Sequence, residues 1–231
     1  MTTRILYIIF VIGLFITCNN RTEQKGFDNS EINEILNIVF DATVGPDTLW
    51  SKNLLIPPVF LPQSGQKSDA DKVEFVKYLR SIDNLKMKLD TAKLYVFIND
   101  SLVKFPENRI RIKSMTESKY FMGNFEIDST FRPLIVKLFN YSESRPLDIS
   151  KLKSKYNYQI DFISNKDKYP SSIIEIGSVN MTNPVFNSDL TMACIYSEIF
   201  CGGECGGGSI IFLKKVNGQW KIEGQRQLWV S

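Results

Sequence analysis

Two cysteines and five glycines stand together in the segment Cys201–Gly208, between stretches rich in β-branched and aromatic residues. A pair of cysteines can form a disulfide, exchange thiols with a substrate, or bind a metal ion as thiolates. This segment is therefore the first place in the sequence to look for chemistry.

A structural disulfide is the interpretation we favour for Cys201 and Cys205. If residues 202–204 form a three-residue hairpin loop, a glycine can take its left-handed position. The two cysteines then face each other across the ladder, about 5 Å apart between Cα atoms, within the range of a disulfide. Closing so small a loop stabilises by about 2 kcal/mol in the chain-entropy model.

Thiol exchange and metal binding are the alternatives for the same segment. Redox pairs favour Cys-x-x-Cys at a helix N-terminus, which lowers the thiol pKa, whereas Cys201 and Cys205 have three residues between them. A metal site would need Cys194 as a third ligand and Glu198 or Glu204 as a fourth. Phosphate binding by the glycines is excluded, because such glycine turns lead into a helix and this one leads into a strand.

A third cysteine lies upstream, in the middle of a predicted strand. Cys194 shares a face of that strand with Met192 and Tyr196, so we expect a buried free thiol. Pairing of Cys194 with Cys201 or Cys205 remains an alternative.

The chain contains no histidine. This removes Ser-His and Cys-His nucleophiles, histidine-ligated zinc and a histidine general base. We assign no catalytic, cofactor-binding or metal-binding residue and expect no cofactor. A net charge of +3 without a block of basic residues does not indicate nucleic acid as a partner.

The N-terminus has the pattern of an export signal. Arg4 precedes an apolar run over residues 5–16, which is shorter than the roughly 20 residues that span a bilayer as a helix. The run ends at Cys18, and no alanine precedes Ala42 to form an ordinary Ala-x-Ala cleavage site.

The stretch Phe15-Ile16-Thr17-Cys18 resembles the lipobox of bacterial lipoproteins. The resemblance implies that residues 1–17 are a signal peptide, that Cys18 is acylated, for example with palmitate, and that the mature protein is lipid-anchored in the cell envelope. Asn19 favours the outer membrane over the inner one. An ordinary secretory leader and an uncleaved membrane anchor are the alternatives.

The rest of the chain predicts an α+β fold. Residues 18–29 form a tether, residues 30–141 a helix-containing N-terminal part, and residues 142–231 an antiparallel sheet, with the last two parts as one domain or two. Two or three helices are expected to pack on a meander of about four strands, in the manner of cystatin-like or NTF2-like sheets.

Apolar residues at helical spacing predict the helices. One helix follows Ser30, carries its apolar stripe from Ile32 to Phe40 and ends at Gly45-Pro46. A second follows Ser68, which we expect to be its N-cap, with Val73, Val76, Leu79 and Ile82 as its apolar stripe. Residues 134–139 are compatible with a strand or a helix.

The strands are clearest near the C-terminus. Four segments rich in β-branched and aromatic residues are separated by turn signals. Asn217-Gly218 predicts a type I′ hairpin, and Gly224 a bulge. We expect Trp220 and Trp229 to be core residues. The segments are 173–178, 190–200, 209–216 and 219–230, with earlier strand candidates at 94–98, 102–105, 110–112 and 121–125.

The C-terminal block also resembles uncharacterised secreted and lipid-anchored bacterial proteins. These share a Cys/Gly-rich turn, an Asn-Gly-x-Trp hairpin and a Leu-Trp-Ile/Val-Ser end, here at Cys201–Gly208, Asn217–Trp220 and Leu228–Ser231. The resemblance implies a fold element and no particular activity.

Together these features predict a non-enzymatic envelope lipoprotein that binds another protein, a glycan or a small ligand. The alternative is an enzyme, either a histidine-free hydrolase or a thiol oxidoreductase using Cys201 and Cys205.

Overall fold

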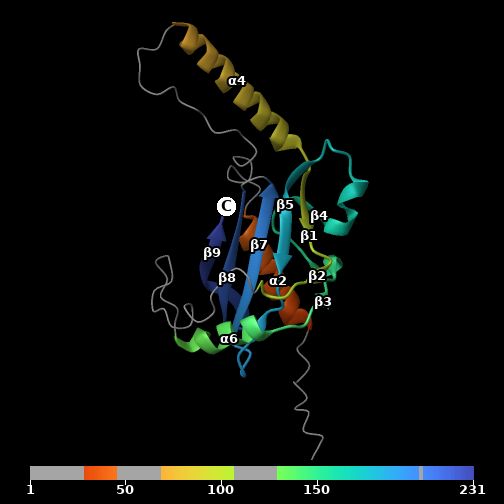
Figure 1. Cartoon of the computed structure of the whole chain (residues 1–231), viewed down its shortest axis with the longest axis vertical. Coiled ribbons are helices and arrows are strands. Elements are labelled where there is room, and N and C mark those ends of the chain that lie inside the picture. The colour runs from red at the N-terminus through yellow and green to blue at the C-terminus, as the bar shows by residue number, and fades with distance from the viewer. Residues whose placement is uncertain (1–28, 46–68, 107–128, 203–204) are drawn as a thin grey trace, which may run out of the picture. The chain divides into compact units, whose positions relative to one another are not determined.

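The computed structural model describes residues 29–45, 69–106, 129–202 and 205–231 (Figure 1). The chain divides into two compact units, Met1–Ile32 and Asn33–Ser231, and all described strands belong to the second. The leader, Cys18, the expected tether up to residue 28, Ser68 and the candidate strands at 110–112 and 121–125 lie outside the described residues. Asn29, also assigned to the tether, is instead the first residue of a helix.

The described helices and strands follow one another in a mixed α+β order. The helices are α2 (Asn29–Val44), α4 (Asp69–Thr91) and α6 (Arg132–Asn140), with short 3₁₀ segments η2 (Ser129–Phe131), η3 (Ile149–Lys151) and η4 (Ile163–Lys168). The strands are β1 (Leu94–Ile98), β2 (Ser101–Leu102), β3 (Arg145–Pro146), β4 (Tyr158–Phe162), β5 (Ile174–Met181), β6 (Val185–Phe186), β7 (Met192–Gly202), β8 (Cys205–Val216) and β9 (Gln219–Val230).

Within the described residues, one sheet has the strand order β4-β1-β5-β7-β8-β9, and β6 adds a short pairing to β7. Strands β5, β7, β8 and β9 are antiparallel, which confirms the predicted meander. The Asn217-Gly218 turn joins β8 to β9 with φ angles of 53° and 79°. Both angles are positive, as a type I′ turn requires, so this prediction is also confirmed.

Strand β1 lies between β4 and β5 and runs parallel to both. Its apolar sequence suits this central position, where Leu94, Val96, Phe97 and Ile98 are all buried. A segment before residue 142 thus contributes a strand to the same sheet as the C-terminal segments.

Helix α2 covers the face of the sheet that is turned away from the viewer in Figure 1. Its predicted apolar stripe is confirmed by the buried residues Ile35, Leu36, Val39 and Phe40. It ends as expected at Gly45, whose φ of 75° is left-handed and whose N–H donates to the carbonyl of Asp41.

Polar side chains fix α2 along its length. Glu34 accepts the backbone N–H of Trp220 at 3.1 Å, and Asn37 accepts that of Lys153 at 2.7 Å. One turn further on, Asp41 accepts the hydroxyl of Ser154 at 2.6 Å. Because these acceptors lie three and four residues apart, they share one side of the helix.

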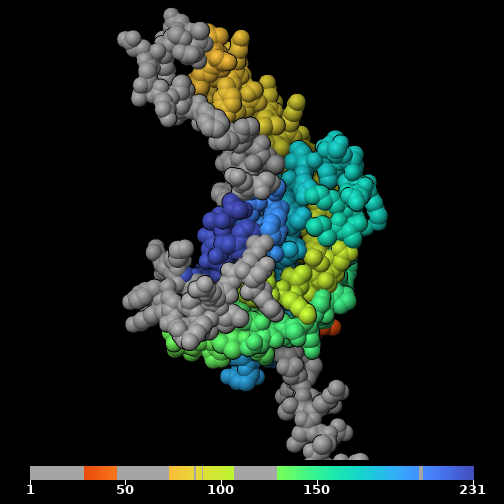
Figure 2. Space-filling view, viewed as in Figure 1, coloured from red at the N-terminus to blue at the C-terminus, as the bar shows by residue number. Residues whose placement is uncertain are grey.

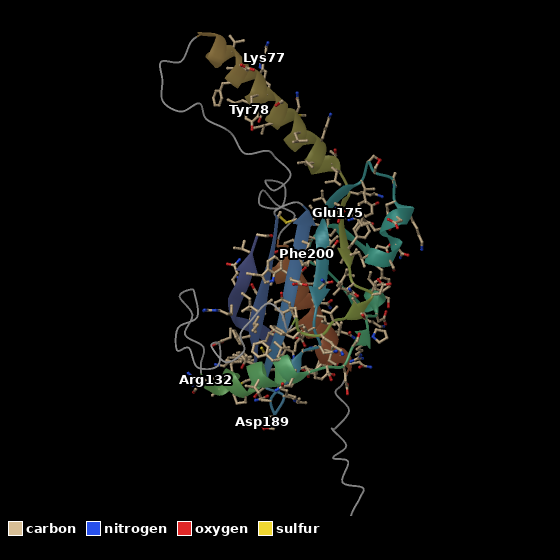
Figure 3. The ribbon with its side chains drawn as sticks, in the orientation of Figure 1. Lys77, Tyr78, Arg132, Glu175, Asp189 and Phe200 are labelled. Atoms are coloured by element: carbon tan, nitrogen blue, oxygen red, sulfur yellow. A yellow bond between two sulfur atoms is a disulfide. The ribbon has the colours of Figure 1, made fainter. Side chains whose placement is uncertain are left out.

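Helix α6 crosses the opposite face, at the end of the sheet near Asp189 (Figures 2 and 3). The ambiguous segment 134–139 is therefore helical. Leu134, Ile135, Leu138 and Phe139 are buried in an apolar cluster with aromatic residues of the sheet. The ammonium of Lys137 donates to the carbonyl of Phe186 and ties α6 to β6.

The predicted apolar stripe of α4 is wrong for three of its four residues. Val73, Val76 and Leu79 are 56%, 46% and 42% exposed, whereas Ile82 is buried as expected. A different set with steps of three and four residues is shielded instead, so the helix is rotated relative to the expectation. The shielded residues are Phe75, Tyr78, Ile82, Leu85 and Leu89.

A polar contact secures the chain after β4. The hydroxyl of Tyr169 donates to Asp161 at 2.5 Å, and the amide of Asn165 donates to the same carboxylate at 2.7 Å. Mainly because of the Tyr169 hydrogen bond, the pKa of Asp161 lies below its ordinary value. The same bond raises the pKa of Tyr169 to about 12.

We expect this contact to make stability sensitive to alkaline pH. Because the folded pKa of Tyr169 is raised, its contribution is fully present below the ordinary value of 10.0 and is lost as the pH rises through about 12. The difference in unfolding free energy between wild type and Tyr169→Phe, measured by urea unfolding, should shrink over that interval. A difference that stays constant there would contradict the assignment.

Candidate functional site

The cysteine pair lies at the neck of the β7–β8 hairpin, where Figure 3 draws the disulfide in yellow. Cys201 and Cys205 are joined in the structure, with Cα atoms 5.1 Å apart. The ladder shifts at this point, because Phe200 pairs with Gly206 and Gly202 pairs with Cys205. The cysteines therefore do not face each other as a register pair, and the extra residue on β7 is Cys201.

The shift in register explains one of the glycines. Gly202 has a φ of 91°, in the left-handed region that favours glycine. The remaining loop residues, 203–204, lie outside the described part of the chain. A left-handed glycine was expected here from the sequence, whereas the bulge beside it was not.

Two further glycines make room for a tryptophan. The indole of Trp229 lies over β8, where a Cβ on Gly208 would overlap both Trp229 Nε1 and the hydroxyl of Tyr196. A Cβ on Gly206 would lie 3.1 Å from the same indole. Gly206 and Gly208 thus allow the close approach of a ring to the backbone.

A hydrogen-bonded network holds the ring in place. Trp229 Nε1 donates to the hydroxyl of Tyr196 at 2.7 Å, and that hydroxyl donates to Glu198 at 2.6 Å. The second carboxylate oxygen of Glu198 accepts from the amide of Asn180 at 3.0 Å. Phe200 packs beside the indole with ring centroids 5.3 Å apart. Three strands, β5, β7 and β9, therefore meet in this network.

Cys194 lies on the α6 face, buried among apolar residues together with Tyr196, and its thiol is free, as predicted. Burial raises the pKa of this thiol, so it stays protonated. The three cysteines do not converge, and no cluster of metal-ligating side chains occurs among the described residues.

On the α2 face, a cavity of about 400 Å³ opens between the end of α2 and the strands β5 and β7 to β9. Its floor is aliphatic, with Ile176, Ile199 and Ile211 from three adjacent strands. The disulfide, Gly206 and Gly207 line the end nearest the hairpin neck. The two faces of the sheet thus differ, since aromatic residues fill the α6 face and the α2 face leaves a hollow.

Hydroxyl and amide groups complete the cavity lining. Thr43 donates to the hydroxyl of Ser197 at 2.8 Å, which joins α2 to β7 at the cavity wall. Ser209 on β8 and Gln225 and Gln227 on β9 supply the remaining polar side chains of the strands. None of the described lining side chains carries a charge.

Sequence reasoning missed this cavity. Gln225 and Gln227 are two residues apart on a predicted strand and so share a face, which was a usable signal. Whether these glutamines line a cavity with α2 depends on how the helix crosses the sheet, and the spacing of residues in the sequence does not specify that crossing.

Comparison with known proteins adds no assignment, since no family model, curated protein or solved structure matches the chain. Among the described residues, no helix is long and apolar enough to cross a bilayer.

Substitution of Gly208 by alanine should destabilise the protein by about 1–3 kcal/mol, because the added methyl group displaces the indole from Tyr196. Gly207→Ala is the matched control, since its Cβ would lie at an ordinary 3.5 Å from the carbonyl of Trp229. Urea unfolding followed by tryptophan fluorescence measures both. Equal stability of the two variants would contradict the role given to Gly208.

Proposed function

We propose that this protein is a lipid-anchored component of a bacterial cell envelope that binds a small ligand in the cavity beneath α2. The observation that carries the proposal is the cavity of about 400 Å³, within the size range of small-molecule sites. It combines an aliphatic floor with a few polar side chains, as such sites commonly do.

The lining favours binding over catalysis. The polar side chains that reach the cavity are hydroxyls and amides, which orient a ligand but are poor general bases. The two lining cysteines are held in a disulfide between strands. A thiol oxidoreductase using Cys201 and Cys205 remains the alternative, and reduction of the pair in the exported protein would support it.

The surrounding structure keeps the cavity open. The α2 end is fixed by Thr43 and Ser197, and the last backbone N–H, of Ser231, donates to the carbonyl of Gly206 at 3.0 Å. The disulfide closes the neck beside these groups. A hollow with fixed walls binds at a lower entropic cost than one that must be ordered by its ligand.

The anchor in this proposal is Cys18. Two or more acyl chains on one residue hold a protein stably at a membrane, because each buried methylene contributes about 0.8 kcal/mol. The narrower cystatin-like or NTF2-like fold also belongs to the proposal, supported by a helix packed across consecutive antiparallel strands.

We expect wild-type protein expressed in bacteria to incorporate radiolabelled palmitate, and a Cys18→Ala variant to incorporate none. Cys194→Ala is the matched control, because its buried thiol is inaccessible to acylation. Labelling of the Cys18→Ala variant at the wild-type level would refute the anchor.

A photoreactive, uncharged alkyl alcohol should cross-link the full chain in membranes at peptides from β7 to β9. Gly207→Leu should abolish this labelling by filling the cavity, whereas Gly207→Ala should retain it. Peptide mass spectrometry locates the label, and a thermal melt shows that both variants are folded. Labelling that is unchanged in Gly207→Leu would refute the cavity as the binding site.

A further inference from the structure

The lining assigns a chemical class to the ligand. We infer that the cavity takes an amphiphile without an anionic head group, with an alkyl chain on the isoleucine floor and a hydroxyl, ester or amide group at the β9 side. This inference rests on the proposed binding function and specifies what is bound.

The floor matches an alkyl chain. Ile176, Ile199 and Ile211 lie on neighbouring strands, and Val44 of α2 adds a fourth aliphatic side chain to the lining. No aromatic side chain occurs among the described lining residues, so the site offers no ring on which a sugar or a base would stack. Burial of apolar surface is the main favourable contribution that such a floor can make.

The polar groups lie along one side of the floor. Gln227 pairs in register with Ser209, and Gln225 pairs with Ile211, so both amides border the floor from β9. Within the described residues, the side chains of Ser209, Gln225 and Gln227 make no hydrogen bond to other protein groups. Each amide offers a donor and an acceptor, which suits a hydroxyl, ester or amide of a ligand.

None of the described lining side chains is charged, and this limits the head groups that the site can hold. A carboxylate placed in this cavity would gain no opposite charge from these side chains. A neutral head group loses less on desolvation and regains hydrogen bonds from the amides. The site should therefore favour a neutral head group over a carboxylate among amphiphiles of equal chain length.

The experiment is a competition at neutral pH against the photoreactive alkyl alcohol, using full-length protein in membranes. The competitors are an alcohol, a primary amide and a carboxylate of one chain length, compared at equal membrane-corrected concentrations. The alcohol and the amide should compete at least about tenfold better than the carboxylate. Gln225→Ala combined with Gln227→Ala should weaken the neutral competitors about fivefold, and Gln219→Ala, an exposed glutamine outside the lining, should change nothing.

The outcomes separate this inference from the proposed function. If the probe labels the cavity but the carboxylate competes as well as the alcohol, the ligand class is wrong and the binding function stands. If the double glutamine variant competes like wild type, the assigned head-group position is wrong. If the probe does not label the cavity at all, the binding function and this inference both fail.

Discussion

The contact between one indole and a bare stretch of backbone organises the C-terminal half of the sheet. Trp229 lies over the β8 glycines, and its N–H reaches the hydroxyl of Tyr196. This is possible only because Gly208 has no side chain. The contact holds the end of β9 on the α6 face, and Glu198 and Asn180 extend it across the neighbouring strands. Packing against this ring thus explains Gly206 and Gly208.

The two faces of the sheet are packed differently. On the α6 face, aromatic side chains and a buried thiol fill the space between helix and strands. On the α2 face, serine and glycine replace bulky residues at the hairpin end, and the helix stops at Gly45. The hollow follows from small residues facing the end of a helix, and the filled opposite face gives it a rigid back wall.

Local signals in the sequence predicted local structure well. The Asn217-Gly218 turn, the four C-terminal strands and the stripe of α2 are each encoded by residues close together in the chain. The parallel placement of β1 was not predictable in this way, because its partners lie more than sixty residues later. The prediction of the buried stripe of α4 was wrong because two sets of apolar residues recur at helical spacing on that helix. Only tertiary contacts decide which set is buried. The cavity is lined by residues of α2 and of four strands, so no single segment of the sequence predicts it.

The carboxylate of Glu34 has a consequence for self-association. Strand β9 is at one end of the sheet, and such a strand presents backbone groups that another polypeptide can extend into a fibril-like ladder. By accepting the N–H of Trp220, Glu34 occupies one of these groups and places a negative charge beside it. Glu34 therefore caps one backbone N–H of the edge strand, and a second polypeptide that paired with β9 at Trp220 would have to displace this hydrogen bond.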